Sequence, residues 1–272
     1  MDGRPQWGLS AQRAVLLVAG GALATLLLLP LTALLLSSAP DELVAGLGAP
    51  FIGAALRLSV FSTAVTLALA VSLGTPLAWT LSQAQGRTAR LLESLLQLPV
   101  VIPPAVAGVA LLLAFGRRGL VASLVGPEWG ALSFTTAAVV LAQLFVAAPL
   151  FVQGALAAFR ALDPEVVLAA RALGAGPVRV LVRVAIPMAG PGLIAGAALC
   201  WARALGEFGA TLLFAGNLEG HTQTLPLAIY TAMEVDLRAA RALSVVLIGV
   251  ALLLLLGVRL ATARRPGHTE RP

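Results

Sequence analysis

The stretch from Asp163 to Pro187, DPEVVLAARALGAGPVRVLVRVAIP, is a charged and helix-punctuated segment between two long apolar runs. Asp163 can cap a helix that has Glu165 in its first turn, where an acidic side chain is favourable. Gly174 can end this helix, because glycine tolerates the left-handed conformation. Pro177 can start a second short helix, which we expect to stop near the final proline. Such a segment is where a membrane-embedded protein would meet a soluble partner.

The apolar runs around this segment indicate an integral membrane protein. The chain has 272 residues, of which 59% are hydrophobic and only 11% are charged. Several apolar runs reach about 20 residues, the length that a helix needs to cross the hydrocarbon core of a bilayer. We therefore expect an all-α integral membrane protein with one transmembrane domain over residues 1–272 and about six transmembrane helices. The expected spans are Ala14–Leu36, Leu58–Leu81, Leu95–Phe115, Phe134–Ala158, Pro191–Phe214 and Ala242–Ala261.

The arginines predict how these spans are oriented, because short loops rich in basic residues stay in the cytoplasm. A cytoplasmic N-terminus places most of the 18 basic residues inside. These are Arg4, Arg13, Arg87, Arg90, Arg160, Arg171, Arg179, Arg183, Arg259, Arg264, Arg265 and Arg271. The outer side then carries Arg57, Arg117, Arg118, Arg238 and Arg241, together with Asp41, Glu42, Glu128, Glu219, Glu234 and Asp236. We expect both termini in the cytoplasm, and we interpret the net charge of +6 as topology instead of a nucleic-acid surface.

Residue types that the chain lacks restrict its chemistry. There is no lysine, so the lysine of a Walker A phosphate loop is missing. Neither a Gly-x-Ser-x-Gly elbow nor a His-Glu-x-x-His helix is present. His221 and His268 are too far apart in the sequence to support a metal cluster. We expect that the chain is not an enzyme and binds no cofactor or metal itself.

Arg203 and Glu207 are the only charged residues deep inside an expected span. They are one helical turn apart and can pair. Charges near the middle of a bilayer cost about 2.5 to 3.5 kcal/mol each on insertion scales, and they usually face a bundle interior or an aqueous path. Two interpretations stay open. The pair holds the fifth span against its neighbours, or it is a pathway or gate element for an anion.

Three further residues join this candidate pathway or gate. Phe208 follows Glu207 directly. Pro103 and Pro104 leave backbone carbonyls without their usual donors in the third span. The two prolines are compatible with a kink beside a cavity and equally with simple helix bending.

The quoted segment resembles the EAA loop of ABC-importer permeases. The pattern of that family is Glu-Ala-Ala, three residues, Gly, nine residues and Ile-x-Leu-Pro. The matching positions here are Ala169, Ala170, Gly174, Val184, Ile186 and Pro187. Leu168 stands where the family has Glu, which puts any polar contact of that Glu in doubt. The resemblance implies that residues of about 159–190 form coupling helices that dock into a groove of a cytoplasmic ATPase.

Two other segments extend the resemblance to residues of about 58–260. The run LPVVIPPAVAGVALLLAFGRRG, residues 98–119, resembles the third span and following loop of molybdate-importer permeases. The run ALGEFGATLLFAGN, residues 204–217, is followed by TQTLPLAIYTAME, residues 222–234. These two runs look like the molybdate branch, whereas sulfate permeases share GEFG and TQT but usually diverge afterwards. The chain is thus similar to molybdate ABC-transporter permeases.

This resemblance implies a type I ABC-importer permease architecture in the cell (inner) membrane. The implied assembly is a homodimer with two cytoplasmic ATP-binding subunits, which hold ATP and Mg, and an extracytoplasmic oxyanion-binding protein. Molybdate is the first candidate substrate, and tungstate, sulfate and thiosulfate are alternatives. From the residues alone, two other functions stay open: a secondary transporter or channel that works without an ATPase, and a non-transporting membrane assembly protein.

Overall fold

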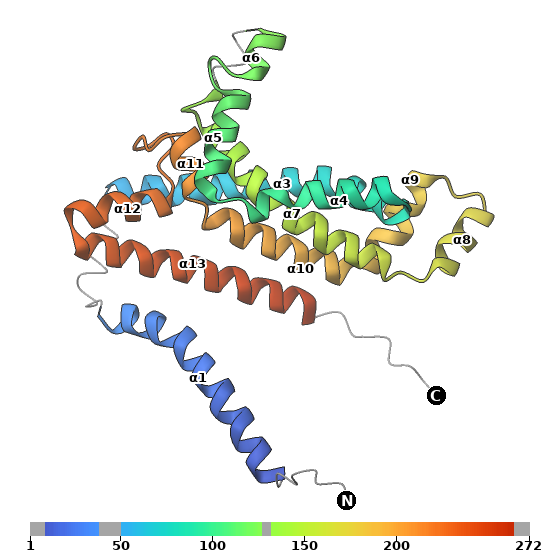
Figure 1. Ribbon diagram of the computed structural model, residues 1–272, viewed down its shortest axis with the longest axis horizontal. Helices are drawn as coiled ribbons and strands as arrows, with labels where there is room; N and C mark the ends of the chain where they lie inside the picture. The colour runs from blue at the N-terminus through green and yellow to red at the C-terminus, as the bar shows by residue number, and fades with distance from the viewer. Residues whose placement is uncertain (1–8, 38–49, 127–131, 264–272) are drawn as a thin grey trace, which may run out of the picture.

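The computed structural model describes residues 9–37, 50–126 and 132–263, and this part of the chain forms helices and turns without a strand. The helices, drawn in Figure 1, are α1 (Leu9–Leu36), α3 (Pro50–Gln83), α4 (Arg87–Val101), α5 (Pro104–Phe115), α6 (Leu120–Val125), α7 (Thr136–Arg160), α8 (Pro164–Ala172), α9 (Pro177–Val180), α10 (Ile186–Leu205), α11 (Gly209–Phe214), α12 (Leu225–Val235) and α13 (Leu237–Ala263). A π-helical turn, Leu181–Ala185, joins α9 to α10.

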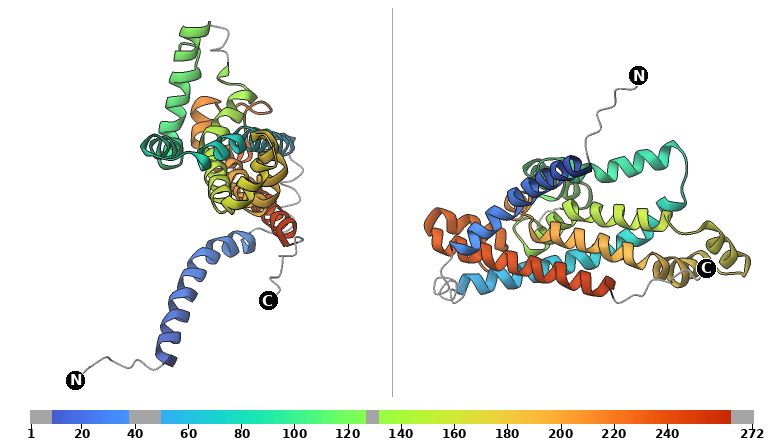
Figure 2. Two further views of the ribbon diagram at one scale, coloured as in Figure 1. Left: turned by 90° about the vertical axis from the view of Figure 1, so that its right-hand side faces the viewer. Right: turned by 90° about the horizontal axis from the view of Figure 1, so that it is seen from below.

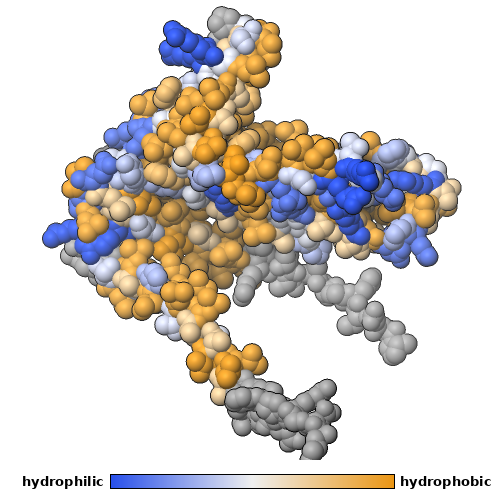
Figure 3. Space-filling model, viewed as in Figure 1, coloured by the Kyte–Doolittle hydropathy of each residue, from blue (hydrophilic) through white to orange (hydrophobic). Residues whose placement is uncertain are grey.

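The long helices α3, α7, α10 and α13 lie side by side and form the body of the molecule (Figures 1 and 2). Helix α7 is at its centre, and its buried side chains include Phe151 and Phe159. Trp79 of α3 packs edge-on against Phe159, with ring centroids 5.3 Å apart. Hydrophobic side chains cover the middle of the surface in Figure 3, and hydrophilic ones gather at the α8–α9 end and around α12. This distribution is the one that a surrounding bilayer requires.

Six helical segments of the described chain are long and apolar enough to cross a membrane, which confirms the expected number of spans. They are Arg13–Leu36, Ile52–Gln83, Pro104–Val125, Thr136–Arg160, Pro177–Leu205 and Leu237–Gly257. The first segment has none of its window buried within the chain, and α1 stands apart from the other helices in Figure 2. Arg4, Arg264, Arg265, Arg271, Asp41, Glu42, Glu128 and His268 lie outside the described residues.

The third expected span, Leu95–Phe115, is wrong as a single helix. Helix α4 ends at Val101, and α5 begins at Pro104 and leaves the bundle at a steep angle (Figure 1). A proline disfavours helical geometry in the residue before it. Accordingly, Ile102 and Pro103 are both extended, with ψ of 143° and 140°. The two prolines therefore redirect the chain and do more than bend one helix.

The fifth expected span, Pro191–Phe214, is also wrong at both ends. At its start, α10 follows α9 without a break through the π-helical turn. The second short helix of the hairpin therefore does not stop near Pro187, although the sequence predicted that it would. The π-turn accommodates this proline, because the Ile186 amide donates to the Leu181 carbonyl five residues earlier. At the other end, α10 stops at Leu205, and α11 is a separate helix that begins at Gly209.

Candidate functional site

Helix α8 and the turn after it have the local structure that the sequence predicts. The Asp163 carboxylate accepts a hydrogen bond from the Glu165 amide at 2.9 Å and caps α8. At the other end of α8, Gly174 has a φ of 82°. The Gly174 amide donates to the Arg171 carbonyl, and the next amide donates to the Ala170 carbonyl, at 2.9 and 3.1 Å. This pair of bonds is the Schellman motif, which reverses the chain right after a helix.

The hairpin is anchored on one side and open on the other. Val167 and Val180 are buried, and Ala170 and Ile186 are half-buried against the same core cluster. The outer side presents exposed apolar side chains between arginines. These exposed residues are Leu168, Ala169, Leu173, Val178, Arg171 and Arg179, and Pro187 is exposed at the π-turn while Val184 is half-buried. An exposed apolar surface with a charged rim is typical of a docking site for another protein.

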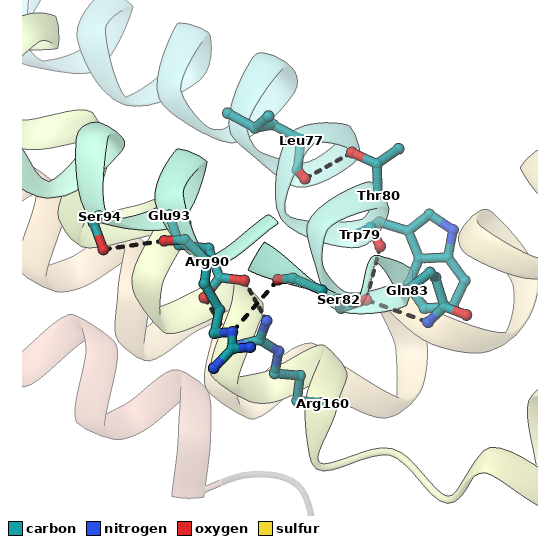
Figure 4. Close-up of polar contacts among 10 residues, drawn as sticks. Leu77, Trp79, Thr80, Ser82, Gln83, Arg90, Glu93, Ser94 and Arg160 are labelled. Carbon is teal, nitrogen blue, oxygen red and sulfur yellow. Dashed lines mark hydrogen bonds and ion pairs between the residues drawn. The ribbon is translucent and has the colours of Figure 1, made fainter. Parts of the chain in front are cut away.

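Leu168 lines a pocket of about 270 Å³ between the hairpin and the bundle, together with two arginines. Arg160, the last residue of α7, pairs with Glu93 of α4, and Figure 4 shows these side chains pointing toward each other. Arg171 of α8 donates to the side-chain oxygen of Gln83 at 3.4 Å. Both guanidinium groups thus find partners on α4 and α3, and neither needs a carboxylate at position 168.

The structure brings Arg203 and Glu207 together as the sequence predicts. The Arg203 Nη1 atom donates to the Glu207 Oε2 atom at 2.6 Å, and the two side chains are 31% and 1% exposed. The second carboxylate oxygen accepts the Ala210 amide at 2.8 Å. Because Arg203 lies in the last turn of α10, the expected position near the middle of a continuous helix is wrong. Glu207 connects the end of α10 to the start of α11.

Close contacts fix α11 against α5 and place Pro104 at this junction. A Cβ atom on Gly209 would lie 2.7 Å from the Cβ atom of Pro104, and one on Gly108 would lie 2.7 Å from that of Leu213. Only glycine permits so close an approach. The Phe208 ring packs against Tyr230 of α12, with ring centroids 5.3 Å apart, and not against the Arg203–Glu207 pair. Pro103 precedes α5 as its N-cap residue, and it makes no hydrogen bond to the pair in the described structure.

A buried polar ladder on α3 was not predicted. Ser59, Ser62, Thr63 and Thr66 are all buried, and each bonds to another helix. The Leu225 amide of α12 donates to Ser59 Oγ at 2.7 Å, and Gln143 Nε2 of α7 donates to Ser62 Oγ at 3.1 Å. Trp201 Nε1 of α10 donates to Thr63 Oγ1 at 3.0 Å, and Thr66 donates to Gln143 Oε1 at 3.1 Å. The i, i+3, i+4, i+7 spacing of these residues in an apolar span is the sequence signal for one polar face.

We expect Ser59→Ala to destabilise the protein by about 1 to 3 kcal/mol, because the buried Leu225 amide loses its acceptor. Thermal unfolding in detergent measures the loss. Ser72→Ala is the matched control on the same helix, because the exposed Ser72 hydroxyl donates to the Leu69 carbonyl of its own helix and, in the described part of the chain, to no other helix. Equal unfolding midpoints for the two variants would show that the ladder does not hold α12.

Comparisons with known proteins agree with this arrangement. The family described as "Binding-protein-dependent transport system inner membrane component" matches residues 70–264. The molybdenum transport system permease protein ModB of Mycobacterium bovis is 46% identical over 216 residues, which cover 79% of this chain and 81% of that protein. Its namesake in Escherichia coli K12 is 39% identical over 180 residues, which cover 66% of this chain and 78% of that protein. A solved bacterial ABC transporter for import of the acidic polysaccharide alginate has a TM-score of 0.72 at 16% identity, over 96% of this chain and 98% of that one.

Proposed function

The chain belongs to the family of binding-protein-dependent transport system inner membrane components, and we propose that it is the permease subunit of an ATP-driven molybdate importer. The choice of molybdate as the substrate is supported by the 46% identity to a molybdenum permease over 216 residues. The fold is that of type I ABC-importer permeases. Such a subunit performs no covalent chemistry on its substrate, and its work is to open and close a pathway.

We propose three partners for this permease. The exposed side of the α8–α9 hairpin is proposed to dock on a cytoplasmic ATP-binding subunit, which would hold ATP and Mg. A second copy of the chain would complete the pathway as a homodimer. An extracytoplasmic oxyanion-binding protein would deliver molybdate at the opposite end, near α12. Closure of the ATPase would move the hairpin, and α10 is continuous with α9, so the motion would reach Arg203 directly.

Substrate selectivity is the part of this proposal that transport assays test most simply. Vesicles containing the permease, its ATPase and its binding protein should take up labelled molybdate. An excess of unlabelled molybdate should suppress the uptake, and the same excess of sulfate should leave most of it. Suppression by sulfate equal to that by molybdate would move the assignment to a general oxyanion or sulfate permease.

The orientation gives a separate prediction. A reporter placed near Gly220 should be extracytoplasmic, and one fused after Arg265 should be cytoplasmic, because most arginines then lie inside. Enzymatic reporters that are active on one side of the membrane measure this. The six-span topology is wrong if both fusions report the same side.

A further inference from the structure

Three hollows follow one another along α7, from the α8–α9 hairpin toward the middle of the bundle. The first is the pocket of about 270 Å³ that Leu168 and Arg171 line, called the basic pocket below. The second is a narrow passage between α4 and α7. The third, called the apolar hollow, has a volume of about 370 Å³. The passage and the apolar hollow share Leu96, Pro149 and Val152, so they are continuous.

The basic pocket and the passage meet at the end of α7. Arg160 lines the basic pocket, Glu93 lines the passage, and the two side chains pair with each other. On α3, Leu81 lines the passage and the next residue, Ser82, lines the basic pocket. The three hollows therefore form one groove, which α3, α4 and α7 enclose.

The apolar hollow suits a hydrocarbon ligand. Its described lining consists of apolar side chains from α3, α4 and α7. Small or compact residues open it, because Ala148 and Pro149 of α7 line it together with Pro99 of α4. Leu95, another lining residue, is 51% exposed, so the hollow is accessible from the outer surface of the chain. Its volume falls within the range of about 300 to 1,000 Å³ that is typical of pockets for small molecules.

The length of the groove matches one leaflet of a bilayer. Phe145, which lines the apolar hollow, lies about 15 residues before Arg160 on α7, a distance of about 22 Å at the helical rise. A bilayer is about 40 to 45 Å thick with its headgroups, so one leaflet measures about 20 to 22 Å. A single lipid molecule can therefore reach from the basic pocket to the apolar hollow.

The basic pocket supplies donors for an anionic headgroup. Its described lining contains Arg160 and Arg171 and no carboxylate, and Leu168 stands in it at the position where the EAA pattern has Glu. A guanidinium group has five N–H donors. In the described structure, Arg160 uses two of them on Glu93, and Arg171 uses one on Gln83 at 3.4 Å. The remaining donors are available to phosphate oxygens, which form strong charge-assisted hydrogen bonds with arginine.

We propose that this groove binds an anionic phospholipid from the leaflet on the side of the α8–α9 hairpin. Its phosphate would lie between Arg160 and Arg171, and one acyl chain would follow α7 into the apolar hollow. Glu93 does not oppose this, because Arg160 already neutralises its charge. The bound lipid would link α8 to the bundle. The inference goes beyond the proposed function and requires only that the chain spans a membrane.

The test measures lipid binding to the purified full-length chain in a neutral detergent by native mass spectrometry. Phosphatidylglycerol and phosphatidylcholine with identical acyl chains are titrated separately, and each gives a Kd. We expect phosphatidylglycerol to bind about tenfold or more tightly than phosphatidylcholine, because its net negative charge meets two arginines. Inorganic phosphate in the same titration should not displace it, since the acyl chain contributes much of the affinity.

Two arginine variants locate the headgroup. Arg171→Gln should weaken phosphatidylglycerol about fivefold and phosphatidylcholine less than about twofold. Arg179→Gln is the matched control, because Arg179 is an exposed arginine of the same hairpin outside the lining of the basic pocket. It should change both Kd values less than about twofold.

A third variant locates the acyl chain. Ala148→Phe places a ring in the apolar hollow and should weaken both lipids about fivefold or more, because each displaced methylene group lowers the affinity. Thermal unfolding in the same detergent shows whether the variant keeps its fold. The arginine variants change exposed side chains, so they decide the proposal even if Ala148→Phe unfolds early.

Loss of the phosphatidylglycerol preference in Arg171→Gln, with Arg179→Gln like the wild type, supports the groove. Equal binding of the two lipids to the wild type overturns it, and so does an equal loss in both arginine variants, which indicates a diffuse basic surface. Displacement by inorganic phosphate would identify a site for a free anion instead. Lipid bound to single copies but not to dimers would show that a second copy covers the groove. Uptake is not measured, so a wrong substrate assignment leaves this test intact.

Discussion

ATP-driven uptake should fall to background in a Gly174→Val variant. Gly174 has a φ of 82° with open space around its missing Cβ atom, so the variant suffers from backbone strain and not from a clash. A left-handed residue with a side chain costs about 1 to 2 kcal/mol, and a β-branched one costs more. The Schellman turn should therefore open and displace α9 relative to α8. We expect a permease that still inserts in the membrane but docks its ATPase weakly or hydrolyses ATP without transport.

Gly176→Val is the matched control for this variant. Gly176 is two residues away, also has open space at its Cβ position, and has an ordinary extended backbone with φ of −67° and ψ of 163°. Its uptake should stay close to that of the wild type. Gly174→Asn should recover part of the uptake, because asparagine tolerates the left-handed region. Unchanged uptake in Gly174→Val would remove the hairpin from the coupling mechanism.

The second large effect is expected for Arg203→Ala. This change leaves the Glu207 carboxylate, which is 1% exposed, with the Ala210 amide as its one hydrogen-bond partner among the described residues. Breaking a buried pair costs about 3 to 5 kcal/mol, and we expect the lower end because Arg203 is partly exposed. We expect uptake to drop about tenfold or more, because a buried carboxylate without its cation disturbs the junction of α10 and α11. Glu207→Gln keeps the shape and one of the two acceptor oxygens and leaves no buried charge unpaired, so it should lose less uptake than Arg203→Ala.

A double variant separates a pathway role from a packing role. Arg203→Met with Glu207→Gln removes both charges and retains an acceptor for the Ala210 amide, which keeps α11 capped. Such replacements of buried pairs often preserve stability. If this variant unfolds at the wild-type temperature but transports poorly, the charges act on the translocated anion. If it transports at wild-type rates, the pair has no role in translocation.

The hairpin could be predicted from the sequence because its signals are local. The cap at Asp163, the turn at Gly174 and the helix start at Pro177 each depend on a few neighbouring residues, and the structure confirms all three. The number of spans was predictable for the same reason, since length and hydropathy decide whether a helix can cross a bilayer. The i, i+4 pairing of Arg203 and Glu207 also follows from helix geometry.

The missed features depend on contacts between distant parts of the chain. The separation of α11 from α10 needs the Glu207 cap together with the approach of Gly209 to Pro104, which lies far away in the sequence. Helix α12 is held in place by the hydrogen bond from the Leu225 amide to Ser59, which is 166 residues away in the sequence. A serine in an apolar run shows polarity but not its partner. The π-turn before Pro187 was missed because a proline signals a helix end or a kink, and the packing around it chooses between them.

The central claim is that this chain moves molybdate only when a partner ATPase drives it through the α8–α9 hairpin. The most direct test is accumulation of labelled molybdate in proteoliposomes that contain the permease, the ATP-binding subunit and the binding protein, with ATP on the side of the hairpin. The account predicts accumulation above the external concentration that requires all three proteins and ATP. Equal accumulation without the ATP-binding subunit, or accumulation driven by an ion gradient alone, would contradict it and identify a secondary transporter.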